Sequence, residues 1–284
     1  MLGDSAPPIP RRSSAGRLAV GGALVGLFAF SALLAPLISP YDPGRVPGTL
    51  TREMLRAPEA AHPFGTDALG RDVFSRVLHG GRVSLALGLG AEIVAAALGA
   101  AIGLTAGYYG GWRDSLLMRL TDVVMAFPSL ILAIGLIAVF ERPGLDKVAL
   151  VLVALGWTTI ARVVRGEVLS LKERDYIQAA RALGVGHRMV LLRHLLPNAV
   201  GPLIVTATIG VGGNMIAEAG LSFLGLGAQA PTISWGSMLA EGQTFLVTAP
   251  WAAFFPGAAL LSAVLGINLL GDALRDLLDP RFKP

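Results

Sequence analysis

The stretch VSLALGLGAEIVAAALGAAIGLTA, at residues 83–106, decides the fold of this chain, and Glu92 is its single charged residue. The hydrocarbon core of a bilayer requires about 20 mostly apolar residues for one helical crossing. The stretch lacks the alternation of polar and apolar residues that a membrane β-strand requires. It therefore predicts a transmembrane α-helix.

The composition of the whole chain agrees with a membrane protein. Of its 284 residues, 54% are hydrophobic and 15% are charged, whereas soluble domains contain about 25% charged residues. This balance excludes a soluble globule and a disordered chain. Cysteine is absent, which excludes disulfides, thiolate catalysis, iron–sulfur clusters and cysteine-based zinc sites. The net charge of +4 is interpreted as a property of cytoplasmic loops and not as a sign of nucleic-acid binding.

Five further stretches resemble the first in length and apolar character, so we expect an all-α integral membrane protein with six transmembrane helices. The expected spans are residues 18–38, 83–106, 116–140, 147–164, 199–219 and 251–270. Arg11, Arg12 and Arg17 precede the first span, as in a secretory signal. The apolar run that follows exceeds the roughly 7–15 residues of a signal sequence, so we expect an uncleaved helix.

The basic residues favour a topology with both termini in the cytoplasm, which places 15 of the 23 lysines and arginines on the cytoplasmic side. The remaining segments are then a cytoplasmic tail at 1–17, an extracytoplasmic segment at 39–82, a permease core at 83–270 that contains a cytoplasmic loop at 165–198, and a cytoplasmic tail at 271–284. An amphipathic helix is expected at about residues 72–82. This helix would lie on the membrane, meet an external protein or simply position the second span.

Motifs for the common enzyme classes are missing. A P-loop requires Gly-Lys-Ser/Thr, and none of the lysines, Lys147, Lys172 and Lys283, follows a glycine. The four histidines form no metal-ligand spacing, and Gly-x-Ser-x-Gly does not occur. We therefore expect a chain that is not an enzyme and binds no metal or cofactor itself.

The cytoplasmic loop is the most informative polar segment. RDYIQAARALG, at residues 174–184, predicts a short helix that stops at Gly184. A second helix is predicted to present one apolar stripe and to end at Pro197. The members of this stripe are Val185, Met189, Leu192 and Leu196. The two helices would form a compact knob over residues 174–196, suited to docking in the groove of a partner. A basic loop held to anionic lipid is the alternative.

The spacing in the knob resembles the "EAA" loop of ABC importer permeases, whose pattern is Glu-Ala-Ala, x3, Gly, x9, Ile, x, Leu-Pro. The matching residues are Gln178, Ala179, Ala180, Gly184, Leu196 and Pro197. The chain departs from the pattern at Gln178, in place of Glu, and at His194, in place of Ile.

Four other stretches resemble the C-type permease of the dipeptide/oligopeptide/nickel family of ABC importers. They are HPFGTD followed by GRDV at residues 62–73, ARVVRG at 161–166, LSFLGLG at 221–227, and GDALRD through the Asp-Pro pair at 271–280. The ordered set covers nearly the whole chain from about Leu18.

This resemblance implies a type I ABC importer fold in the bacterial cytoplasmic (inner) membrane. It implies as partners a homologous B-type permease, two ATPase subunits that hold ATP and Mg, an extracytoplasmic substrate-binding protein and the lipid bilayer, with no nucleic acid. The ATPases would seat on the knob. The residues implied for this contact are Asp175, Tyr176, Gln178, Ala179, Ala180, Arg181, Gly184, Leu196 and Pro197.

Three acidic residues are candidates for the translocation path or its gate. Glu92 would contact the amino group of a peptide or bond a neighbouring helix, because a charge inside a span faces protein or water. Asp122 is expected to pair with Arg119, three residues before it on the same helix. Glu218 would be a gate residue or an interface anchor. Glycines four apart, such as Gly22 and Gly26 or Gly99 and Gly103, predict close helix packing within the chain or against the partner permease.

Two alternatives to peptide import by an ABC system stay open. A proton-coupled secondary transporter would use Glu92 and Asp122 as proton carriers, although it would be expected to show internal repeats. An ABC importer for nickel or another non-peptide ligand is the second, because the cargo is chosen largely by the binding protein.

Overall fold

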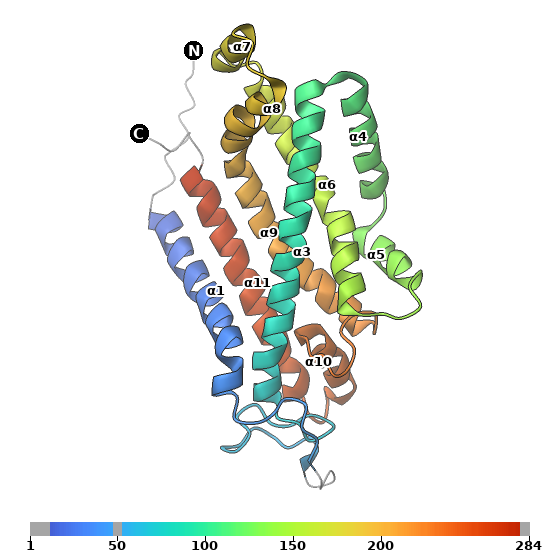
Figure 1. Cartoon of the computed structure of the whole chain (residues 1–284). Coiled ribbons are helices and arrows are strands. Elements are labelled where there is room, and N and C mark those ends of the chain that lie inside the picture. The colour runs from blue at the N-terminus through green and yellow to red at the C-terminus, as the bar shows by residue number, and fades with distance from the viewer. Residues whose placement is uncertain (1–11, 48–52, 279–284) are drawn as a thin grey trace, which may run out of the picture.

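A computed structural model describes residues 12–47 and 53–278, and in these ranges every regular element is a helix (Figure 1). Five helices are long and apolar enough to cross a membrane: Ala15–Ile38, Val73–Tyr109, Leu145–Leu171, His187–Phe223 and Trp251–Leu278. A bent pair, Gly111–Met125 with Ser129–Ala138, would be the sixth if it is counted as one span. The predicted all-α membrane fold is confirmed.

The long helices lie side by side as a bundle. In chain order they are α1 (Arg12–Ile38), α3 (Val73–Tyr109), α6 (Leu145–Leu171), α9 (Leu196–Phe223) and α11 (Trp251–Leu278). α7 (Asp175–Ala182) lies at one end of the bundle, and α10 (Trp235–Gly242) lies at the other, near the long connection between α1 and α3 (Figure 1). Arg11 and the positions 279–284, which belong to the predicted tails, lie outside the described residues.

α3 is a single helix of 37 residues. Asp72 caps its start, because the carboxylate accepts a hydrogen bond from the Ser75 backbone N–H at 2.7 Å. Gly110, with φ +65°, ends it. The stretch 72–82, expected as a separate amphipathic helix, is therefore the first part of α3.

The expected third span is broken into α4 (Gly111–Met125) and α5 (Ser129–Ala138), which meet at 88°. Pro128 lies at the break and precedes the first residue of α5. Because proline disfavours helical conformation in the residue before it, α4 cannot continue through Phe127.

Glycines bring α3 and α6 together. A Cβ at Gly99 or Gly103 would lie 2.5 Å from the backbone carbonyl oxygen of Trp157 or Ala161, and one at Gly107 would lie 2.8 Å from Val168. Each glycine therefore allows the α6 backbone to approach where a side chain would stand. The predicted close packing is confirmed for these positions. Gly22 and Gly26 meet nothing within 4 Å in the described chain.

The buried core forms three clusters along the bundle. One cluster joins the α7 end of α3 and α6 to the knob, and it includes Tyr108, Val168, Ile177, Val190 and Leu195. A second surrounds Trp235 and Met215 near the α10 end, and a third surrounds Val148 and Leu221 beside α5. Both ends of α3 are thus packed into core.

We predict that Gly103→Ala lowers the thermal stability of the purified chain in mild detergent. The added methyl group would press on the Ala161 carbonyl, and overpacking of this kind costs about 1–3 kcal/mol. Gly90→Ala is the matched control, since it lies in the same helix with open space around it. Alanine is favoured over glycine in a helix by about 0.5–1 kcal/mol, so the control should melt no lower than the parent. Equal melting temperatures for the two variants would contradict the close α3–α6 packing.

Candidate functional site

The knob begins with α7, and local interactions fix both of its ends. Asp175 lies in the first turn and Arg181 in the last, where each charge complements the helix dipole. At the end of α7, Val185 N–H donates to the Ala180 carbonyl at 3.1 Å, and Gly184 N–H donates to the Arg181 carbonyl at 3.0 Å. Gly184 has φ +77°, which a residue with a Cβ adopts only with strain. This glycine shapes the turn out of α7.

One face of α7 is buried and the other is free. Ile177 and Ala180 anchor the helix on the core. Of the other predicted coupling residues, Asp175, Tyr176, Gln178, Ala179, Gly184 and Pro197 are exposed, and Arg181 and Leu196 are half-buried. The large apolar side chains of the knob that are exposed are Tyr176, Leu183, Met189 and Leu192. An apolar surface of this kind on a protruding element is typical of a docking site.

The predicted apolar stripe of the second helix is confirmed at Val185 and Leu196, which pack against the core cluster of the knob, and is wrong at its other two positions. Met189 and Leu192 are about half exposed, whereas Val190 and Leu195 are fully buried. The reason is that Val190–Leu195 (η1) is a π-helical segment, in which the repeat is longer than the 3.6 residues of an α-helix. Residues five apart therefore share the inner face.

The second helix also does not end at Pro197. Helix continues from His187–Met189 (α8) through η1 into α9, so that His187–Phe223 forms one apolar helical run. Leu196 N–H bonds to the Leu191 carbonyl across the π turn. Pro197 follows within the first turn of α9, where its missing N–H is tolerated. The knob is therefore continuous with α9.

A tyrosine near the end of α3 contacts two residues of the knob. The Tyr108 hydroxyl lies 2.7 Å from His187 Nδ1, and the Arg181 guanidinium carbon lies 4.7 Å from the centroid of the Tyr108 ring. Lys172 Nζ, just before the knob, donates to the Gly107 carbonyl at 3.2 Å. The role of Tyr108 could not be predicted from local sequence patterns, because His187 is 79 residues away along the chain.

A cavity of 1490 Å³ opens in the bundle. Its wall is formed mainly by α1, α3 and α9, with further residues from α6, α11 and the 231–233 segment. We call this cavity the central groove. Most of its lining is apolar, including Leu89, Ile93, Ile204 and Val211. This volume is larger than the roughly 300–1,000 Å³ of a typical small-molecule site.

Glu92 lies in the wall of the central groove. It is 4% exposed and accepts a hydrogen bond from Asn214 Nδ2 at 2.8 Å. A Cβ at Gly210 would collide with the Glu92 carboxylate. Glu92 is thus a buried acid that bridges α3 to α9, seated over a glycine.

Asp122 has a different partner from the one predicted. Its carboxylate pairs with Arg162 of α6 at 2.5 Å, so the expected pair with Arg119 is wrong. A second ion pair joins α4 and α6. In this pair Arg165 of α6 donates to both carboxylate oxygens of Asp114 of α4, at 2.5 and 2.6 Å. Helical spacing alone could not reveal that basic residues of α6 face α4. Asp122 does not line the central groove.

Glu218 is fully buried, away from the groove lining. Its carboxylate accepts hydrogen bonds from Ser84 Oγ at 3.1 Å and Ser222 Oγ at 2.7 Å. Trp235 N–H donates to the same Ser84 hydroxyl at 3.2 Å. Glu218 therefore links α9 to α3, and through Ser84 to the start of α10.

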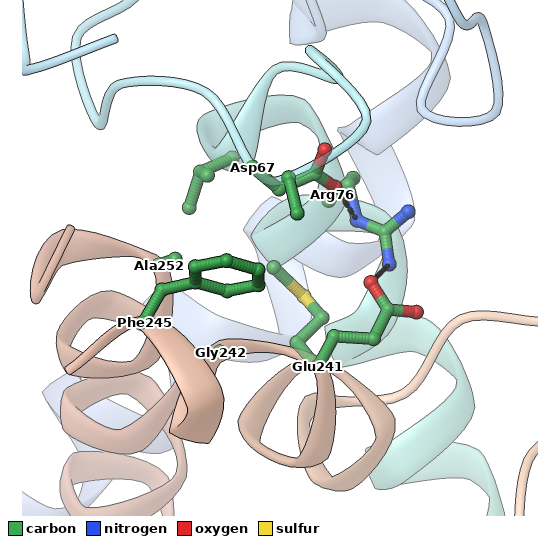
Figure 2. A pocket seen from close by; sticks show the side chains of 9 residues that line it. Asp67, Arg76, Glu241, Gly242, Phe245 and Ala252 are labelled. Atoms are coloured by element: carbon green, nitrogen blue, oxygen red, sulfur yellow. Dashed lines mark hydrogen bonds and ion pairs between the residues drawn. The ribbon is translucent and has the colours of Figure 1, made fainter. Parts of the chain in front are cut away.

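Charged residues at the α10 end form a second network, in which Arg76 is buried and Glu241 is exposed (Figure 2). Arg76 of α3 is 1% exposed and donates from Nη2 to Glu241 Oε2 at 2.9 Å, while its Nε lies 3.4 Å from Asp67. Arg71 bonds the same two carboxylates, at 2.5 Å to Glu241 and 2.7 Å to Asp67. Figure 2 shows Arg76 lying between Asp67 and Glu241. This network, which the sequence did not predict, fastens α10 to α3 and to the loop before it.

Within the described residues, no three histidine or acidic side chains gather as a metal site.

The fold matches a solved transporter. The chain has a TM-score of 0.60 to a structure titled "Inward facing conformations of the MetNI methionine ABC transporter", at 19% sequence identity, covering 72% of this chain and 97% of the other. The bundle is therefore an ABC importer permease fold.

The family follows from sequence comparison. The model for the binding-protein-dependent transport system inner membrane component matches residues 99–284, and the chain belongs to this family. It is 41% identical over 264 residues to the dipeptide transport system permease protein of Alkalihalophilus pseudofirmus, covering 93% of this chain and 86% of that protein. It is 44% identical to a putative peptide transport system permease of Brucella suis, covering 93% and 88%. It is 44% identical to a glutathione transport system permease of Escherichia coli, covering 96% and 89%.

We predict that Glu218→Ala destabilises the bundle, because it removes the acceptor shared by Ser84 and Ser222 and leaves their hydroxyls buried. A buried polar group left without its partner costs about 1–3 kcal/mol, so the melting temperature in detergent should fall by several degrees. Glu141→Ala, at an exposed position, is the control and should leave the melting temperature unchanged. A Glu218→Ala protein as stable as this control would show that Glu218 is not an anchor.

Proposed function

We propose that this permease forms half of the translocation path of an importer for short peptides and is driven by separate ATPases that seat on the knob. One observation carries the proposal. The knob presents free apolar side chains outward and is continuous with α9, which lines the central groove. Force applied to the knob would therefore act directly on a wall of the groove.

The knob is suited to a helix-in-groove contact. Its outer face combines the exposed Ala179, which permits close approach, with larger apolar groups at Leu183 and Met189. The carboxylate expected from the EAA pattern is replaced by Gln178, which donates instead to the Lys172 carbonyl at 3.2 Å. Docking would thus rest on apolar contact and shape more than on charge at this position.

The proposed topology places the knob in the cytoplasm and α10 outside, in a bacterial inner membrane. The excess of lysine and arginine on the α7 side of the chain supports this orientation. A homologous permease would close the open side of the central groove, and a binding protein would deliver cargo at the α10 end. ATP and Mg would be held by the ATPases, since no lysine of this chain has the P-loop context.

Glu92 is the proposed path residue among the three acidic candidates, because it alone of the three lines the central groove. Its bond to Asn214 supports a role in holding α3 against α9. Asp122 is in an ion pair with α6, and Glu218 is hydrogen-bonded to Ser84 and Ser222, so these positions favour structural roles for both.

Short peptides are the proposed cargo because the similar proteins named above transport a dipeptide, peptides and glutathione, as their names state. Proteoliposomes that contain the full complex test the mechanism. Uptake of a labelled dipeptide should require ATP inside with the ATPases, as well as the binding protein outside. Uptake by the chain alone under a proton gradient would favour the secondary-transporter alternative.

We predict that Gly184→Val abolishes co-purification of the ATPases in mild detergent and abolishes ATP-dependent uptake. The valine would have to adopt φ near +77° at the turn that shapes the docking face, and its side chain would stand on that face. A β-branched residue in this region is an outlier.

Gly225→Val controls for backbone strain, because Gly225 has φ +78° and, like Gly184, open space around it, but lies away from the knob. This variant should retain the ATPases. If Gly184→Val also retained them, the ATPases would not be seated on the knob.

A further inference from the structure

The two ends of α3 contact the knob and α10, respectively. Tyr108, near the last residue of α3, contacts the knob through His187 and Arg181. Arg76, in its first turn, contacts α10 through Glu241. Arg76 and Tyr108 are 32 positions apart in the sequence, which corresponds to about 48 Å at 1.5 Å per residue. One helix therefore touches both the proposed ATPase dock and the element at the opposite end of the bundle.

α3 is one continuous helix, so that a displacement at one end can reach the other. It contains no proline and no break between Val73 and Tyr109. Three of its glycines are in backbone-close contact with α6, and interiors packed in this way transmit displacement because they resist compression. α6 ends just before the knob, where Lys172 is bonded to the Gly107 carbonyl of α3. The pair α3–α6 thus supports the knob as one unit.

α10 is fastened to the outer part of α3 by more than the Arg76–Glu241 pair. Trp235 is 1% exposed, and its Nε1 donates to the Val77 carbonyl at 2.8 Å. Its ring lies over Gly81, where a Cβ would come within 2.8 Å of the ring. A shift of α3 along its axis would therefore displace α10 at both ends, because Trp235 at the start of α10 and Glu241 near its end are both bonded to α3.

Resting on the proposed function, we infer that α3 is a connecting rod that carries displacement of the knob to α10, with Tyr108 and Arg76 as positioning residues at its two ends. Tyr108 connects the rod to the knob, and Arg76 connects it to α10. Movement of the ATPases would then reposition α10 at the opposite end of the bundle (Figure 1). Neither residue touches cargo or nucleotide.

The experiment uses the reconstituted transporter complex and needs no cargo. The chain contains no cysteine, so spin labels can be attached at Leu37→Cys on α1 and Thr244→Cys just after α10, both at exposed positions. The distance between the labels is measured without nucleotide and with ATP plus vanadate. The parent complex should show a new distance population with ATP plus vanadate.

Tyr108→Phe keeps the ring under Arg181 but removes the bond to His187. We expect the nucleotide-induced population to fall about fivefold, the change that loss of one ordinary hydrogen bond implies, while the ATPases stay bound and the melting temperature falls by no more than about 4 °C. Tyr109→Phe is the matched control, because no hydrogen bond of the Tyr109 hydroxyl occurs within the part of the chain that the structure describes. It should respond like the parent.

Glu241→Gln weakens the outer connection and should also reduce the nucleotide-induced population, with Glu141→Gln as its exposed control. Both contacts lie on the same rod. The double variant should therefore reduce the nucleotide-induced population by clearly less than the product of the fold-reductions measured for the two single variants. A double variant that reduced the population by the full product of the two single reductions would overturn the rod.

Other outcomes separate this inference from the proposed function. A full response in Tyr108→Phe with the ATPases bound would overturn the rod and leave docking intact. Loss of the ATPases from Tyr108→Phe would also overturn it, since Tyr108 would then act on docking. A parent complex without bound ATPases would instead overturn the proposed function.

Discussion

The close packing of α3 on α6 is the constraint on which the rest of the structure depends. Gly99, Gly103 and Gly107 bring the two backbones together at points where any side chain would collide. Without a hydrophobic force between helices in a bilayer, such small-residue contacts are a main source of association. The pair supports the knob at one end and α10 at the other, and α3 also lines the central groove. The knob, one wall of the central groove and the contact with α10 therefore all depend on the packed pair of α3 and α6.

Much of this fold could be predicted from the sequence because membrane spans have a strong, local signal. The run at 83–106 contains one charge in 24 residues, and the spacing of Ala179, Ala180, Gly184 and Pro197 marks the knob. Gly184 is a good example, since a glycine stop after a short helix predicts the left-handed turn that the structure has. The family resemblance was likewise confirmed by the comparisons.

Features that depend on distant residues could not be predicted. The π-helical segment moved Val190 and Leu195 to the inner face, because a local change in helical repeat leaves no mark on the hydrophobic pattern. Asp122 pairs with Arg162 on another helix and not with Arg119 on its own helix. The partner of Tyr108 is 79 residues away along the chain, and the partner of Arg76 is 165 residues away. Helical spacing describes neighbours on one helix, whereas these contacts are set by how helices pack.

Site-directed cross-linking in native membranes tests the central claim, that ATPases seat on the knob, most directly. A photoreactive group attached at Ala179→Cys, the exposed alanine of α7, should form an adduct with an ATPase subunit. The same group at Glu141→Cys, beyond the other end of α6, should not. An ATPase adduct at both positions, or at neither while the ATPases co-purify with the chain, would contradict the account.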